Sequence, residues 1–161
     1  MRRSVGRMDP ELQATVDHVA LSRLQAAYAD GVTRRDWPAV GALFLPGASV
    51  ELDLGDRPGR TLRGPDELVA FVGAAIARFA FFEFVILNAH IELAPAGDVD
   101  AASARLWMCE LRQEAGSTER SEAFGVYLDD YRRVDGAWRI AGRRYRSLAR
   151  HPEGAVFPFD R

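Results

Sequence analysis

Glu110 is the side chain of this sequence best suited to acid–base chemistry. It follows the apolar run 106–109. In the wall of an apolar cavity the ionised form of its carboxyl would be disfavoured, which raises the pKa toward the range useful to a general base or acid. Arg143 nearby would act in the opposite direction, or would instead anchor a substrate enolate or carboxylate. Tyr28 and Tyr127 supply hydroxyls for a developing oxyanion, so these four residues form the candidate catalytic set.

Each candidate also has a structural interpretation. Glu110 and Arg143 on neighbouring strands would form a simple ion pair, and a register slip of one residue would turn both outward. Tyr28 falls on an apolar helix stripe, where tyrosines commonly pack in the core. Tyr145 would either contact a ligand or only plug the exit of a cavity. His90 is a further candidate at the rim of a cavity.

Other chemistries find no support in the sequence. His and carboxylate residues do not share metal-ligand spacing, and the GxSxG, P-loop and dinucleotide motifs are absent, so neither a metal nor a cofactor is expected. Cys109 is the only cysteine and is expected to be a buried, inert thiol. The net charge of −2 argues against a nucleic-acid partner. The N-terminus lacks an apolar signal segment, and apolar runs are too short for a membrane span, which predicts a cytoplasmic protein.

The elements that would position these residues are helices first and strands later. Asp9 caps a long helix with an apolar stripe from Val16 to Val32, loosened near Gly31. Shorter helices are predicted over 40–45, after the cap Asp36 and before Pro46, and from Gly64 with a buried face extending to Phe79. Strands are predicted over 49–54, 60–63, 81–93, 101–113, 119–134 and 137–148.

Asp135 and Gly136 join the last two strands, and Asp-Gly is the pair that a type I′ hairpin turn favours. The predicted helices lie mostly in the first half of the chain and the long strands in the second, without the alternation of strand and helix typical of βαβ units. This order predicts an α+β fold with an antiparallel sheet. The chain reads as a single domain over 9–150. A disordered tail over 1–8 precedes it, and a tail over 151–161 follows as a candidate pocket lid or dimer contact.

Several ordered segments resemble one known family. They are YADGVTRRDWPAVGALFLPGASV at 28–50, GPDELVAF at 64–71, Asn88 with Ile91, and YRRVDGAWRI at 131–140. Over about residues 12–148 the chain resembles the NTF2-like superfamily in its SnoaL-like branch. The resemblance implies a cone, a curved and mostly antiparallel sheet wrapped around the long N-terminal helix. It also implies an apolar pocket inside and dimerisation through the outer face of the sheet.

Within this branch the chain is most similar to scytalone dehydratase and bile-acid dehydratases, which use an Asp–His pair and tyrosines. Transferred to this sequence, that pair falls at Thr33 and Phe84, while the tyrosine on the first helix is retained as Tyr28. The other functional positions fall at Leu52, Glu110, Gly125 and Tyr127. The resemblance therefore implies that this chain has the cone and its pocket but lacks the Asp–His pair that acts as acid and base in these dehydratases.

If Phe84 and Leu52 point inward, as the resemblance implies, strand alternation turns Glu110, Tyr127 and Arg143 to the same side. The predicted ligand contacts are Leu52, Phe71, Phe84, Met108, Tyr145 and His90. The expected ligand is a small hydrophobic molecule, polyketide-like or polycyclic, undergoing dehydration, isomerisation or cyclisation. A non-catalytic binding protein and a structural subunit of a larger enzyme remain alternatives. Trp107 should face outward, where a homodimer would cover it.

Overall fold

The computed structural model describes residues 9–159, so the predicted tail over 1–8 lies outside it. Three α-helices are α1 (Pro10–Arg34), α2 (Trp37–Gly41) and α3 (Gly64–Ile76), and a short 3-10 helix spans Pro95–Gly97. The strands are β1 (Phe44–Asp53), β2 (Arg60–Arg63), β3 (Phe79–Leu93), β4 (Ala101–Glu114), β5 (Arg120–Val134), β6 (Ala137–His151) and β7 (Ala155–Val156).

Helix α1 begins where the sequence predicts. The Asp9 carboxylate accepts hydrogen bonds from the backbone N–H groups of Glu11 and Leu12 at 2.9 and 3.2 Å, satisfying amides that the first turn leaves free. Gly31 does not loosen the helix, which continues to Arg34. A Cβ at Gly31 would lie 2.9 Å from the Val40 side chain, so the glycine lets α2 pack closely against α1.

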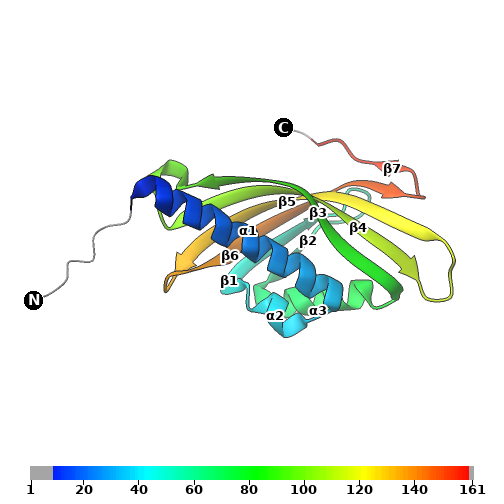
Figure 1. Cartoon of the computed structure of the whole chain (residues 1–161). Helices are drawn as coiled ribbons and strands as arrows, with labels where there is room; N and C mark the ends of the chain where they lie inside the picture. Colours follow the sequence, from blue (N-terminus) through cyan, green and yellow to red (C-terminus); the bar gives the residue numbers. More distant parts are fainter. Residues whose placement is uncertain (1–8, 160–161) are drawn as a thin grey trace, which may run out of the picture.

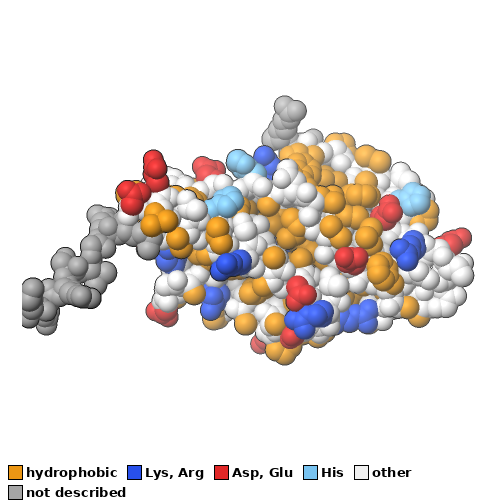
Figure 2. Space-filling view, viewed as in Figure 1, with side chains coloured by type: hydrophobic (Ala, Val, Ile, Leu, Met, Phe, Trp, Pro, Cys, Tyr) orange, Lys and Arg blue, Asp and Glu red, His pale blue; other side chains and the backbone are white. Residues whose placement is uncertain are grey.

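The prediction of an apolar stripe on α1 is confirmed in the second half of the helix for Leu24, Tyr28 and Val32, which are buried, but not for Ala27, which is exposed. The first half does not follow the prediction. Val16 and Val19 are 44% and 42% exposed, and with Leu12 they leave an apolar strip on the surface (Figure 2). The buried positions in this half are Asp17 and Leu21 instead. Asp17 turns inward because it binds side chains of the sheet, and that contact sets the rotation of the helix.

The second helix is earlier and shorter than predicted. Asp36 caps it through the backbone N–H of Ala39 at 3.2 Å, but the helix ends at Gly41, and β1 starts at Phe44. Pro46 therefore lies within an irregular start of a strand and does not end a helix. Phe79, assigned to the face of α3, begins β3 instead. The short strand β7 was not predicted.

The strands form one curved sheet in the order β2-β1-β6-β5-β4-β3, with β7 added on β6. Only β1 and β6 pair in parallel, and the other pairs are antiparallel. The sheet bends around α1, and α2 and α3 lie at one end (Figure 1). The predicted α+β cone is confirmed. So is the hairpin turn, since Asp135 and Gly136 have φ values of 50° and 77°.

A bulge in β3 changes which of its residues face inward. Phe82 and Phe84 are buried on the concave face, and the register shifts between Ile86 and Asn88. The extra residue reverses the alternation beyond it. His90 is consequently exposed and does not reach the inside, so its prediction as a ligand contact is wrong.

Within residues 9–159, no helix combines the length and apolar character needed to cross a bilayer.

Candidate functional site

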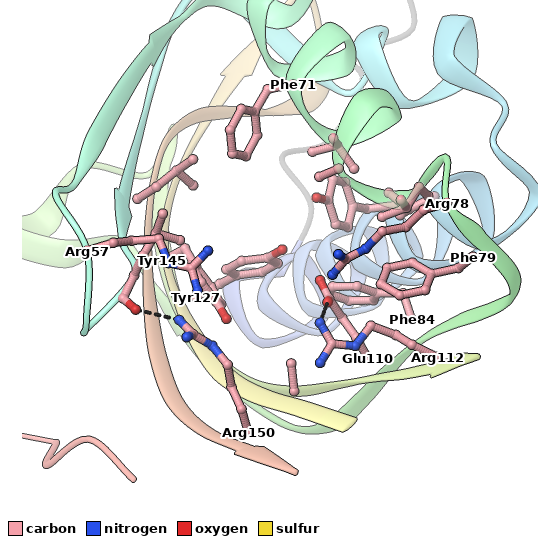
Figure 3. Close-up of a pocket in the computed structure, with 18 of the residues that line it drawn as sticks. Arg57, Phe71, Arg78, Phe79, Phe84, Glu110, Arg112, Tyr127, Tyr145 and Arg150 are labelled. Carbon is pink, nitrogen blue, oxygen red and sulfur yellow. Dashed lines mark hydrogen bonds and ion pairs between the residues drawn. The ribbon is translucent and has the colours of Figure 1, made fainter. Parts of the chain in front are cut away.

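A cavity of about 250 Å³ opens between α1, α3 and the concave face of the sheet (Figure 3). It brings together most of the predicted site residues. Those that line it are Tyr28, Leu52, Phe71, Phe84, Glu110, Tyr127 and Tyr145. An engineered apolar cavity of about 150 Å³ holds benzene, so this space suits a molecule of one or two rings better than a larger polycycle.

Glu110 lies on β4, where it pairs with Phe84 of β3 on one side and Ala123 of β5 on the other. Its carboxylate Oε2 is 3.7 Å from a guanidinium nitrogen of Arg112, too long for a hydrogen bond (Figure 3). Burial raises the pKa of Glu110, and the charge of Arg112 opposes this only in part. A carboxyl whose pKa is raised in this way is a stronger base when ionised than an exposed one, and keeps its proton to a higher pH.

An aromatic wall adjoins this carboxyl. The ring of Tyr28 meets Phe84 and Tyr127 edge-on at 5.5 and 6.0 Å, and Tyr127 stacks on Phe84 at 5.7 Å. Tyr145 meets Tyr127 edge-on at 5.5 Å. Burial raises the pKa of Tyr127 well above its usual range and that of Tyr145 to about 12. Both phenols are therefore neutral hydrogen-bond donors at physiological pH.

Arg143 points inward but does not line the cavity. Its Nε and one terminal nitrogen bind the two carboxylate oxygens of Asp129, each at 2.7 Å, and both side chains are almost completely buried. The proposed pair with Glu110 is wrong because Asp129, directly opposite on β5, takes the guanidinium. The guanidinium carbon lies 4.1 and 4.0 Å from the ring centres of Tyr28 and Tyr127. Arg143 thus packs against the rings of Tyr28 and Tyr127 and does not reach the cavity, so it cannot bind a ligand there.

The pair belongs to a buried polar network that sequence reasoning missed. Tyr131 donates its hydroxyl proton to Asp129 at 2.7 Å, and Gln25 of α1 donates to the Tyr131 oxygen at 3.1 Å. Counting back from the turn would set Leu128 opposite Arg143, but a register shift between Asp130 and Tyr131 brings Asp129 there. Alternation alone could not reveal that shift.

Met108 is likewise not a ligand contact. It faces inward as predicted but is 1% exposed within the hydrophobic core and does not line the cavity. Sequence reasoning missed several apolar side chains of the lining and all of its charged ones except Glu110. The missed charged residues are Arg57, Arg78, Arg112, Arg150 and Glu153. Arg112 has the same strand phase as Glu110, a signal that would have identified it.

The positions of the family's Asp–His pair do meet in space. The Thr33 hydroxyl oxygen accepts a hydrogen bond from the backbone N–H of Phe84 at 3.0 Å. A threonine and a phenylalanine cannot relay a proton as a carboxylate and an imidazole would. Over residues 9–159, no group of His, Cys, Asp and Glu has an arrangement able to hold a metal ion.

The described part of the C-terminal segment, residues 151–159, runs along the outer face of the sheet and past the opening of the cavity. Trp107 faces outward, and Phe159 meets its ring edge-on at 5.3 Å. Phe157 packs on Gly55 near the β1–β2 turn, and Glu153 contributes to the opening of the cavity. The segment up to Phe159 therefore borders the opening without closing it, and residues 160–161 lie outside the described part of the chain.

Comparisons with known proteins identify a family for this chain and solved structures that share its fold. A family model described as a SnoaL-like domain matches residues 13–144. Among solved structures, a candidate scytalone dehydratase from Novosphingobium aromaticivorans DSM 12444 has a TM-score of 0.75 at 18% identity, covering 92% of this chain and 97% of its own. LinA has a TM-score of 0.75 at 16% identity, covering 94% and 99%.

A third structure is a variant of Rv3472, a protein of unknown function from Mycobacterium tuberculosis. Its TM-score is 0.73 at 24% identity, with coverage of 94% of this chain and 83% of its own. At these identities the likeness extends to the fold alone. No curated protein matches the chain.

Proposed function

The chain belongs to the SnoaL-like domain family, and from that premise we propose that it binds a small apolar molecule in the cavity and catalyses a proton transfer on it. Dehydration, isomerisation and cyclisation are the reaction types in question, on a polyketide-like or other ring compound. The observation that carries the proposal is the carboxyl of Glu110, held in an aromatic cavity with a raised pKa.

In this mechanism Glu110 removes a proton from a carbon of the bound molecule or delivers one to its leaving group. Tyr28 and Tyr127 stabilise the negative charge that develops on a nearby oxygen, because a phenol hydroxyl can donate a hydrogen bond to it. Arg143 is a positioning residue whose guanidinium packs on both tyrosine rings. A positioned general base of this kind contributes about 10²–10⁴-fold to a rate.

Native mass spectrometry of the freshly purified protein tests the binding step first. We expect a co-purified small molecule on the wild type. Ala75 lies at the opening on α3 and is exposed, so Ala75→Trp should fold normally and lose the molecule. A wild-type protein that carries no adduct and binds no member of a small aromatic library would contradict the proposal.

The chemical step is tested by exchange with heavy water. Wild-type protein should introduce deuterium into the bound molecule, and Glu110→Gln should retain the molecule but slow its labelling by about 100-fold or more. Glu83→Gln is the matched control, since Glu83 is exposed on the outer face of β3. Binding without labelling in any protein would favour the non-catalytic alternative, which the Thr33–Phe84 contact in place of an Asp–His pair also favours.

A further inference from the structure

The charged residues that line the cavity carry a net positive charge, whereas the whole chain is slightly negative. Four arginines and two glutamates line it, Arg57, Arg78, Arg112, Arg150, Glu110 and Glu153, whereas the chain as a whole carries a net charge of −2. The arginines come from the β1–β2 turn, the turn between α3 and β3, and the strands β4 and β6. Figure 3 shows them in two groups on opposite sides of the opening.

The first group, Arg57 and Arg150, is compensated within the protein by two carboxylates, Asp56 and Glu153, the latter 3.8 Å from Arg150. Arg57 and Arg150 both bind the carboxylate of Asp56, at 3.1 and 2.8 Å. Arg150 also donates to the backbone oxygen of Leu54 at 2.5 Å. With these partners in place, this side of the opening has little capacity left for an anion.

The second group is not satisfied to the same degree. The guanidinium carbons of Arg78 and Arg112 lie 4.8 and 5.5 Å from the ring centre of Phe79, so the two cations flank a single ring. The Nε of Arg112 is buried and has no hydrogen-bond partner among residues 9–159. Its acid neighbour Glu110 is 3.7 Å away, and Arg78 reaches Glu114 at 3.4 Å on the surface.

The ligand-facing donors are the terminal nitrogens of Arg112, whose side chain lines the cavity and whose acid neighbour Glu110 is beyond hydrogen-bond distance. A guanidinium binds a carboxylate through short, charge-assisted hydrogen bonds. We propose that the molecule bound in this cavity is a ring carboxylic acid, with its apolar rings against Phe71, Phe84 and the tyrosines and its carboxylate on Arg112 and Arg78. This inference rests on the proposed function and specifies its substrate class. With a second acid bound nearby, Glu110 carries its proton and takes the second of the two roles proposed for it, delivering that proton to the bound molecule.

The test compares two probes of equal shape and different charge. Binding of 2-naphthoate and of neutral 2-naphthamide to the full-length protein is measured by calorimetry at pH 7. We expect naphthoate to bind at least about tenfold more tightly. Arg112→Gln and Arg78→Gln should each remove most of that preference, with a much smaller change in the affinity for naphthamide.

Arg105→Gln is the matched control, because Arg105 is exposed on the outer face of the same strand and its loss changes the net charge equally. Arg78 is 65% exposed, so its variant keeps the test valid if Arg112→Gln unfolds. Equal binding of both probes would overturn the inference and leave the proposed function standing. If the preference for naphthoate falls equally in Arg105→Gln, it reflects the net charge of the protein and the inference is overturned. If neither probe binds, both the inference and the proposed function are overturned.

Discussion

At the scale of single residues, Glu110 and Arg112 show a site in which neither charge is fully compensated. Burial opposes the ionised carboxyl, and the buried Nε of the arginine has no acceptor among the described residues. Groups held in this way cost stability and are common where a protein performs chemistry. The buried pair of Arg143 and Asp129 is better compensated, with two hydrogen bonds between guanidinium and carboxylate, although the other terminal nitrogen of Arg143 has no partner among the described residues.

Glu110→Gln is expected to stabilise the fold at neutral pH. The pKa of Glu110 is raised above its ordinary value of 4.5, so between that value and the raised pKa the native state binds more protons than the unfolded state. The free energy of unfolding of the wild type therefore falls as the pH rises through this window. The Glu110→Gln variant has no ionisable group at this position, so its free energy of unfolding does not fall for this reason.

Urea denaturation of both proteins from pH 4 to pH 8 measures the effect. The two curves should converge at the acid end and separate above it, with the variant more stable. A variant less stable than the wild type at pH 8 would mean that the Arg112 contact outweighs the burial of the carboxyl.

At the scale of elements, the start of α1 is attached to the β5–β6 hairpin through one carboxylate. Arg133 binds both oxygens of Asp17 at 2.7 and 2.9 Å, and the Trp138 indole N–H donates at 3.2 Å. Burial raises the pKa of Asp17, but these hydrogen bonds and that from Gln13 outweigh it and hold the pKa below its ordinary value. The contact explains why the helix turns this face inward.

Asp17→Asn should destabilise the protein by about 1–3 kcal/mol at pH 7, the cost of a lost hydrogen bond to a charged group. Because the folded-state pKa is lowered, the stabilisation is present above the ordinary value of 3.8 and lost as the pH falls through the lowered one. The gap between wild type and variant should thus shrink in acid. Asp30→Asn, which removes only an exposed pair with Arg34, should change the denaturation midpoint little.

At the scale of the whole molecule, the outer face of the sheet is the surface on which we propose that two copies pair. Leu111 and Trp107 lie there on β4, and Phe159 of the same chain covers part of Trp107. Sedimentation equilibrium should give twice the chain mass of 17.8 kDa. Leu111→Glu, which adds a charge between Glu83 and Glu122, should shift the protein to monomer.

Leu12→Glu, on the exposed strip of α1, is the control for that experiment and should leave the mass unchanged. A wild type that sediments as a monomer at all concentrations would refute the pairing. Circular dichroism of each variant separates dissociation from unfolding.

The sequence by itself determined the elements and the family. Asp9 and Asp36 cap helices, Asp135 and Gly136 form a turn, and alternation marks the long strands, because these signals depend on the local backbone and on which face of a strand is apolar. The inward position of Glu110 followed from the same alternation once Phe84 was taken to face inward.

Only the tertiary structure decided which inward residues meet the cavity and which partners they have. The bulge after Ile86 turned His90 outward, and a register shift paired Arg143 with Asp129. Met108 faces inward but is buried in the hydrophobic core and does not line the cavity. Bulges, register shifts and the meeting of arginines from four separate segments are set by packing between distant parts of the chain. Of these arginines, only Arg112 could have been identified from a local pattern, the strand phase that it shares with Glu110.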